Sequence, residues 1–162
     1  MNDHGAAITQ MQAIMSCTDF TTSFLSLSAH EAVACRALSV AVAALSDLLN
    51  FYTSGKPMPI SEVVVFRTIL SILIQEPGNE QEVLKFMKKA QTRMSELGND
   101  KFFGKGEVGR WEKNWIATNA WNIGTKAGAT KNYELCAEFM SISADFYGVI
   151  MDGEMEGNNI MV

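Results

Sequence analysis

Residues 107–147, EVGRWEKNWIATNAWNIGTKAGATKNYELCAEFMSISADFY, decide the fold of this chain. Apolar residues recur at helical spacing before and after the segment GATKN at residues 128–132, which has the composition of a turn and contains no proline. The stretch is therefore predicted to be a helical hairpin. All three tryptophans of the chain lie in its first helix: Trp111, Trp115 and Trp121.

The hairpin follows the size pattern of a tetratricopeptide (TPR) repeat, a helix–turn–helix unit of about 34 residues with large and small side chains at fixed positions. Ile123 and Gly124 fall on its Leu-Gly pair, and Cys136 falls on the small position of the second helix. Gly124 is predicted to let the two helices approach closely, with Cys136 facing it and Met140 filling the space. The other template positions are Ala120, Ala127, Ser143 and Gly148.

A second helix pair is predicted directly upstream, over residues 60–75 and 80–97. The second of these helices has a capping pair, Asn79 and Glu82, at its start. At its end lies Gly98, which is predicted to adopt the left-handed conformation that glycine accepts at low cost.

Residues 99–109 carry three glycines and the pair Phe102-Phe103, and are predicted to form a compact loop or single turn with the aromatic rings tucked beneath the helices. Because a helical hairpin buries its outer face only against a neighbour, the two pairs are expected to stack. The predicted fold is all-α, an irregular TPR-like helical-hairpin solenoid.

The N-terminal half is predicted to contain a helix over residues 6–17 and a short helix that begins after the N-cap Asp19 and ends at residue 27. Ser28-Ala29-His30-Glu31 fits the capping box, so one long helix is predicted over residues 28–52, buried on more than one face. The glycine and two prolines of residues 53–59 are predicted to end it.

One domain is expected over residues 1–151, followed by a disordered tail over residues 152–162. The apolar run at residues 33–52 is long enough to be considered as a membrane span, but Arg36 and Asp47 interrupt it. Charges at such positions are costly in hydrocarbon, so a buried helix is predicted instead.

The formal net charge is −5, which disfavours direct nucleic-acid binding because basic residues must neutralise phosphates. The N-terminus lacks a basic segment followed by an apolar core, so no secretory signal is predicted. The three cysteines are widely spaced, which predicts buried free thiols in a reducing compartment: Cys17, Cys35 and Cys136.

Four segments carry a resemblance to a known family: SAHEAVACRALSVAVAALSDLLNFY (residues 28–52), KPMPISEVVVFRTIL (56–70), RMSELGNDKFFGKGEVGRWEKNWIATNAWNIG (93–124) and NYELCAEFMSISADFYG (132–148). They resemble the meiotic crossover-promoting TPR scaffolds called Zip-four or Spo-twenty-two-like, most closely the plant members. The most specific part is the run Trp-Glu-x-x-Trp-x-x-x-x-x-Trp-Asn-x-Gly, here Trp111, Glu112, Trp115, Trp121, Asn122 and Gly124.

This resemblance implies a protein of the nucleus and the chromosome axis that promotes crossover formation and synapsis by recruiting other pro-crossover proteins. It implies no catalytic activity, no cofactor and no small-molecule substrate. Members of the family are several times longer than this chain, so the resemblance also implies that the chain is a C-terminal portion.

The template places Trp121 on the concave side of the repeat and makes Thr118, Trp121, Asn122 and Thr125 candidate protein-binding residues. Aromatic side chains with a polar edge commonly anchor interfaces. Trp111 and Trp115 are predicted to pack against the preceding helix. The competing interpretation is that all three tryptophans are core or inter-repeat residues.

Other functions find less support in the residues. A generic TPR adaptor that grips a C-terminal carboxylate could use Asn122, but Thr118, Trp121 and Thr125 supply no cation. A small all-α enzyme would need convergent polar groups in one pocket, and the sequence offers mostly isolated ones.

Metal, nucleophile and phosphate chemistry are not expected. His30 is predicted to be exposed at a helix start and His4 to lie in a mobile terminus, which leaves no zinc cluster. Gly104-Lys105-Gly106 fails the spacing of a phosphate-binding loop. A locally basic region has two interpretations, a solvated helix face or a patch for an acidic partner; its residues are Lys85, Lys88, Lys89, Arg93, Lys101, Lys105, Arg110 and Lys113.

Overall fold

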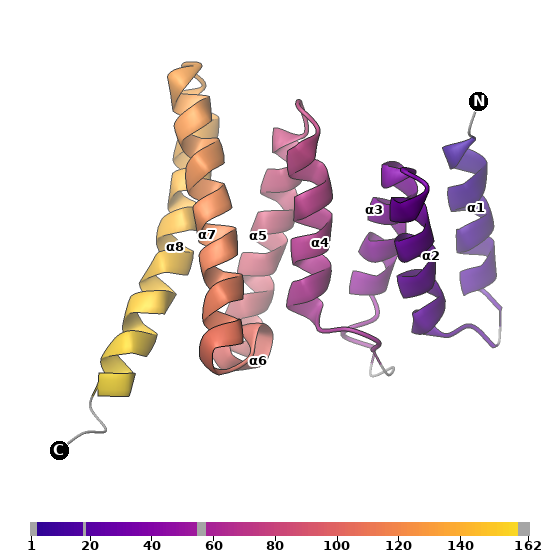
Figure 1. Ribbon diagram of the computed structural model, residues 1–162, viewed down its shortest axis with the longest axis horizontal. Coiled ribbons are helices and arrows are strands. Elements are labelled where there is room, and N and C mark those ends of the chain that lie inside the picture. Colours follow the sequence, from indigo (N-terminus) through magenta and orange to yellow (C-terminus); the bar gives the residue numbers. More distant parts are fainter. Residues whose placement is uncertain (1–2, 18, 55–57, 159–162) are drawn as a thin grey trace. The chain divides into compact units, whose positions relative to one another are not determined.

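The computed structural model describes residues 3–17, 19–54 and 58–158, with side chains up to residue 148. Within these residues it contains eight α-helices and no strand, which confirms the predicted all-α class (Figure 1). The helices are α1 His4–Met15, α2 Thr22–Ala34, α3 Leu38–Leu49, α4 Glu62–Gln75, α5 Glu80–Leu97, α6 Asn99–Phe103, α7 Gly106–Ala129 and α8 Tyr133–Asn158. No helix of this described part is long and apolar enough to span a bilayer.

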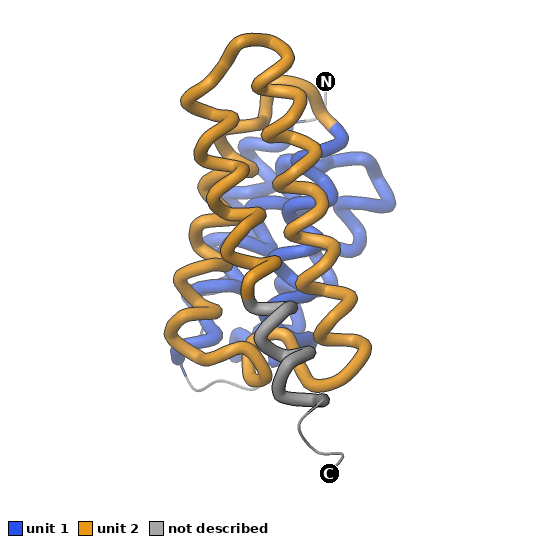
Figure 2. Tube along the Cα trace, turned by 90° about the vertical axis from the view of Figure 1, so that its left-hand side faces the viewer, with its two compact units in different colours: residues 1–75 blue, residues 76–162 orange. Residues whose placement is uncertain are grey.

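The chain divides into two compact units, Met1–Gln75 and Glu76–Val162, where the sequence predicts one domain over residues 1–151. Figure 2 distinguishes them as blue and orange. Unit 1 contains α1 to α4 and unit 2 contains α5 to α8. Each has its own helix contacts, and each is described separately below.

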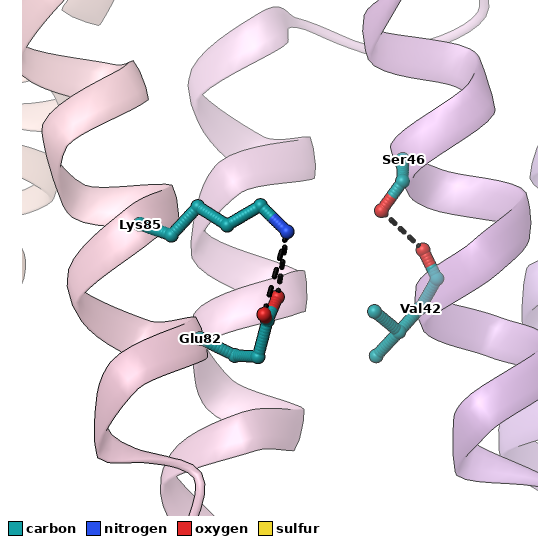
Figure 3. A network of polar contacts seen from close by, with 4 residues as sticks. All are labelled: Val42, Ser46, Glu82 and Lys85. Carbon is teal, nitrogen blue, oxygen red and sulfur yellow. Dashed lines mark hydrogen bonds and ion pairs between the residues drawn. The ribbon is translucent and has the colours of Figure 1, made fainter.

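Unit 1 is organised around α3. This helix packs against α2, α1 and α4. The buried side chains follow the apolar spacing of each helix and include Met11, Leu25, Leu45, Leu48, Phe66, Ile69 and Leu70. On α3, Ser46 bonds within its own helix, because its Oγ donates to the Val42 carbonyl at 2.7 Å (Figure 3).

The prediction of one helix over residues 28–52 is wrong. α2 begins after the N-cap Thr21, not after Asp19, and continues through the capping-box sequence to Ala34. The helix is interrupted between α2 and α3, where Arg36 has φ of 58°. The Arg36 amide donates to the Val33 carbonyl at 3.0 Å and the Ala37 amide to the Ala32 carbonyl at 2.7 Å, which is the Schellman pattern of a helix end.

A hydrogen bond links Tyr52 and Ile60 across the segment between α3 and α4. Tyr52 Oη donates to the Ile60 carbonyl at 2.5 Å. Burial, with the nearby Glu62 carboxylate, raises the pKa of the Tyr52 phenol. The predicted break at residues 53–59 lies here, although residues 55–57 are outside the described part. α4 matches the predicted helix with a start two residues later.

Asp47 is the half-buried acid of unit 1. One carboxylate oxygen, Oδ2, is buried and has no hydrogen-bond partner among the described residues. Desolvation disfavours the charged form, so burial raises the pKa of the Asp47 carboxyl above its usual value.

In unit 2, α5 has the predicted bounds, and Gly98 follows it with φ of 79°. The positive φ is as predicted, but ψ of 157° places Gly98 in an extended region that essentially only glycine occupies. Asn79 is the N-cap residue without a side-chain capping hydrogen bond. Glu82, its predicted capping partner, instead pairs with Lys85 Nζ at 3.0 Å (Figure 3).

The turn between α5 and α7 forms the short helix α6, which buries both phenylalanines as predicted. Phe102 and Phe103 are 3% and 2% exposed, and their rings meet edge to face at 4.8 Å. Phe103 also contacts Phe146 of α8, with ring centroids 5.9 Å apart. α6 therefore contacts α8 through an aromatic pair, and it packs against its chain neighbours α5 and α7.

The α7–α8 hairpin is confirmed, with the close approach that the sequence predicts. A Cβ built on Gly124 would lie 3.2 Å from Met140 Cε and 3.4 Å from the Cys136 carbonyl oxygen. The Cys136 thiol faces Gly128, one turn further along α7, at 3.2 Å from its built Cβ. Ser143 is 1% exposed and donates to the Ala117 carbonyl at 2.9 Å, which fixes the register of the two helices.

α8 continues to Asn158, within the stretch that was expected to be a tail, and residues 159–162 lie outside the described part. The expectation of buried thiols is wrong for Cys17 and Cys35, which are exposed, while Cys136 is half-buried. Cys35 caps α2 and Cys17 follows α1, positions where a helix meets solvent.

Candidate interaction surface on α7

One side of α7 is buried and the other faces solvent. The buried side carries mostly small or apolar residues: Gly109, Glu112, Ile116, Ala117, Ala120, Gly124 and Ala127. Their spacing of three and four residues keeps them on one side of the helix, where α6 and α8 pack. On the remaining side of this 24-residue helix, many side chains are exposed.

All four candidate binding residues lie on the exposed side: Thr118, Trp121, Asn122 and Thr125. Trp121 is 52% exposed. The Thr125 hydroxyl bonds the Trp121 and Asn122 carbonyls at 3.1 and 2.9 Å, so its polar group is satisfied within the helix. The Asn122 side chain makes no hydrogen bond within the described part of the chain, which leaves its amide available to a partner.

The three tryptophans differ in their exposure to solvent. Trp115 is half-buried, whereas Trp111 is 53% exposed. Trp111 and Trp121 are therefore not core residues, while the alternative of inter-repeat packing stays a prediction.

Tyr147 of α8 belongs to the same surface and was not a sequence candidate. It is 40% exposed, and its hydroxyl lies 3.3 Å from Thr118 Oγ1 across the two helices. Val108, in the first turn of α7, is 71% exposed. Val108 precedes Trp111 by three residues, so helical spacing could have indicated Val108. Only the pairing of α7 with α8 places Tyr147 beside Thr118.

The cations of the locally basic region differ in their surroundings. Three cations of α5 are paired with acids: Lys85 with Glu82, Lys88 with Glu138 at 2.6 Å, and Arg93 with Glu96. Two others lie over aromatic rings, Lys89 over Phe86 and Lys113 over Phe103, each at 5.4 Å from the ring centroid. Near α7, Lys105 and Arg110 remain exposed.

The histidines and possible metal ligands of the described residues form no cluster. The described part contains no group of three or more histidine, cysteine, aspartate or glutamate side chains arranged to hold a metal ion. His30 is exposed as predicted. His4 is not in a mobile terminus, because it begins α1 and its Nδ1 lies 2.9 Å from Ser39 Oγ of α3.

No protein-family model matches this sequence, and no solved structure matches its fold.

Proposed function

We propose that this chain is a non-enzymatic protein-interaction scaffold of meiotic recombination, located in the nucleus on chromosomes. In this role it promotes crossover formation and synapsis by recruiting other pro-crossover proteins. Its helical hairpins form a TPR-like solenoid, and the exposed side of α7 holds the partner. The resemblance of four segments to the meiotic TPR scaffolds supplies the biological setting of this proposal.

One observation supports the binding role more than any other. Trp121 is 52% exposed within a regular helix whose opposite side is fully packed. A large aromatic side chain left in solvent costs hydration free energy that a partner would recover on binding, and tryptophans are common energetic centres of interfaces. Thr118, Asn122 and Thr125 surround it with polar groups, as expected at an interface that must also be soluble alone.

The proposal is tested by pull-down from meiotic extract with the wild-type chain and with a Trp121→Ala, Asn122→Ala double variant. We expect the variant to lose its partners while circular dichroism reports an unchanged helix content. Tyr133→Ala is the matched control, because Tyr133 is an exposed aromatic residue at the start of α8. Unchanged recovery with the double variant would refute the binding role of this surface.

A further inference from the structure

The exposed side of α7 carries a regular row of residues, here called the α7 seam. It consists of Val108, Trp111, Trp115, Thr118, Asn122 and Thr125. Successive members are separated by three, four, three, four and three residues. This alternation is the spacing with which one helix packs along another, because it keeps a line of side chains pointing at the partner over several turns.

The seam is also where exposed apolar surface gathers. Eight large apolar or aromatic side chains are exposed among the described residues, and four of them lie on or beside the seam: Val108, Trp111, Trp121 and Tyr147. Scattered single exposures are normal in folded proteins, whereas a group on one face indicates a contact surface.

The exposed charges of α7 and of the residues directly flanking it are mainly positive, although the whole chain is acidic. The exposed charged residues from 105 to 131 are Lys105, Arg110, Lys126, Lys131 and one acid, Glu107. Among the acids of α8, Glu138 pairs with Lys88 and Asp145 accepts from Gln91, while Glu134 is exposed in the first turn. Acidic residues on a partner would complement this surface.

We infer that the α7 seam binds an amphipathic helix of a partner protein, with apolar residues facing Trp111 and acidic residues flanking them. The occupant is not a second copy of this chain, since two seams would bring like cations together. This inference rests on the proposed protein-binding function and specifies the chemistry of its partner.

The test is a display library of helical peptides with randomised seam and flanking positions, selected on the complete 162-residue chain. We expect enrichment of apolar residues at helical spacing with glutamate or aspartate at the flanks. Absence of enrichment, or enrichment of basic flanks, would overturn the inference.

Two variants of the chain then locate the selected peptide. Trp111→Ala should weaken its binding about tenfold or more, as for a central interface aromatic, while Tyr133→Ala should not change it. The Arg110→Glu, Lys126→Glu double variant should bind the acidic peptide more weakly and prefer a version with lysine at the flanks. Equal binding by the wild type and Trp111→Ala would contradict the location.

Two further results separate this inference from its premise. If extract partners depend on Trp121 and Asn122 but no selected helix depends on Trp111, the protein-binding function stands and the helical partner does not. If sedimentation reveals a wild-type dimer that Trp111→Ala abolishes, the seam joins two copies and the inference fails. In both cases circular dichroism of each variant confirms that the fold is intact.

Discussion

Gly109 lies at the closest backbone contact that the described glycines make. A Cβ built there would lie 2.0 Å from the Gly104 carbonyl oxygen and 2.8 Å from its carbon. Both atoms belong to the backbone, so no side chain can rotate away to make room. Any residue larger than glycine must push the start of α7 away from the end of α6.

We therefore expect Gly109→Ala to lower the free energy of unfolding by about 2 kcal/mol or more, measured by urea denaturation. Gly148→Ala is the matched control, since no atom lies within 4 Å of its built Cβ and it is also helical. Alanine should stabilise that position by about 0.5–1 kcal/mol. Equal effects of the two substitutions would contradict the close contact.

Asp47 gives a prediction about pH. Because burial raises its pKa above the usual 3.8, the unfolded chain loses this proton at lower pH than the folded chain. The folded state is therefore penalised at neutral pH, and the penalty disappears once the pH falls below about the unfolded value. Asp47→Asn should raise the urea midpoint at neutral pH and lose this advantage in acid. An advantage that persists at the lowest pH would refute the assignment.

Glycine positions illustrate what a sequence can and cannot predict at this scale. Gly124 was predictable because a repeat template relates it to Cys136 and Met140. Gly109 was not, because its constraint comes from the Gly104 carbonyl, and a backbone atom leaves no signature in residue type.

At the scale of the helix, α2 and α7 end with the same backbone conformation. Arg36 after α2 and Lys131 after α7 have φ of 58° and 63°, a conformation unfavourable for residues with a Cβ. At the second site the Lys131 amide donates to the Gly128 carbonyl at 3.0 Å and the Asn132 amide to the Ala127 carbonyl at 2.9 Å. Both helix ends are therefore Schellman motifs that lack the usual glycine.

Arg36→Gly and Lys131→Gly should each raise the free energy of unfolding by about 1 kcal/mol, because glycine relieves the left-handed strain. Ala137→Gly, at an exposed position inside α8, is the control and should lower it by about 1 kcal/mol. Chemical denaturation of the three variants measures this. Destabilisation by all three would show that the arginine and lysine side chains outweigh the backbone strain.

These ends also explain which elements were predictable. The turn between α7 and α8 was expected from the segment at residues 128–132, although Gly128 itself is helical and faces Cys136. The turn between α2 and α3 was missed because its left-handed residue is Arg36, with neither glycine nor proline beside it. The capping-box residues 28–31 misled in the same region, since that pattern also occurs inside helices.

At the scale of the molecule, charge sets the expected partners. The formal net charge is −5, and three cations of α5 are already paired with acids. We expect no saturable binding of a short DNA duplex at physiological salt in an electrophoretic mobility-shift assay. A shift that weakens steeply with added salt would contradict this expectation and assign phosphate contacts to the exposed cations near α7.

The candidate interaction surface on α7 was predictable from the sequence only in part. The repeat template selected Thr118, Trp121, Asn122 and Thr125, and all four are exposed. The exposure of Trp111 and the position of Tyr147 beside Thr118 depend on how the helices pack. Both are properties of packed helices that spacing along one helix does not contain.

The concentration of Trp111, Trp115 and Trp121 in α7 makes the chain a natural spectroscopic reporter. Unit 1 has no tryptophan, so indole emission follows the unfolding of unit 2 alone, whereas far-ultraviolet dichroism follows helices of both units. Coincident transitions would mean that the two units melt as one cooperative body, and displaced transitions would mean that each melts independently. Intrinsic tryptophan fluorescence, compared with dichroism, therefore shows without an added label whether the two units unfold together.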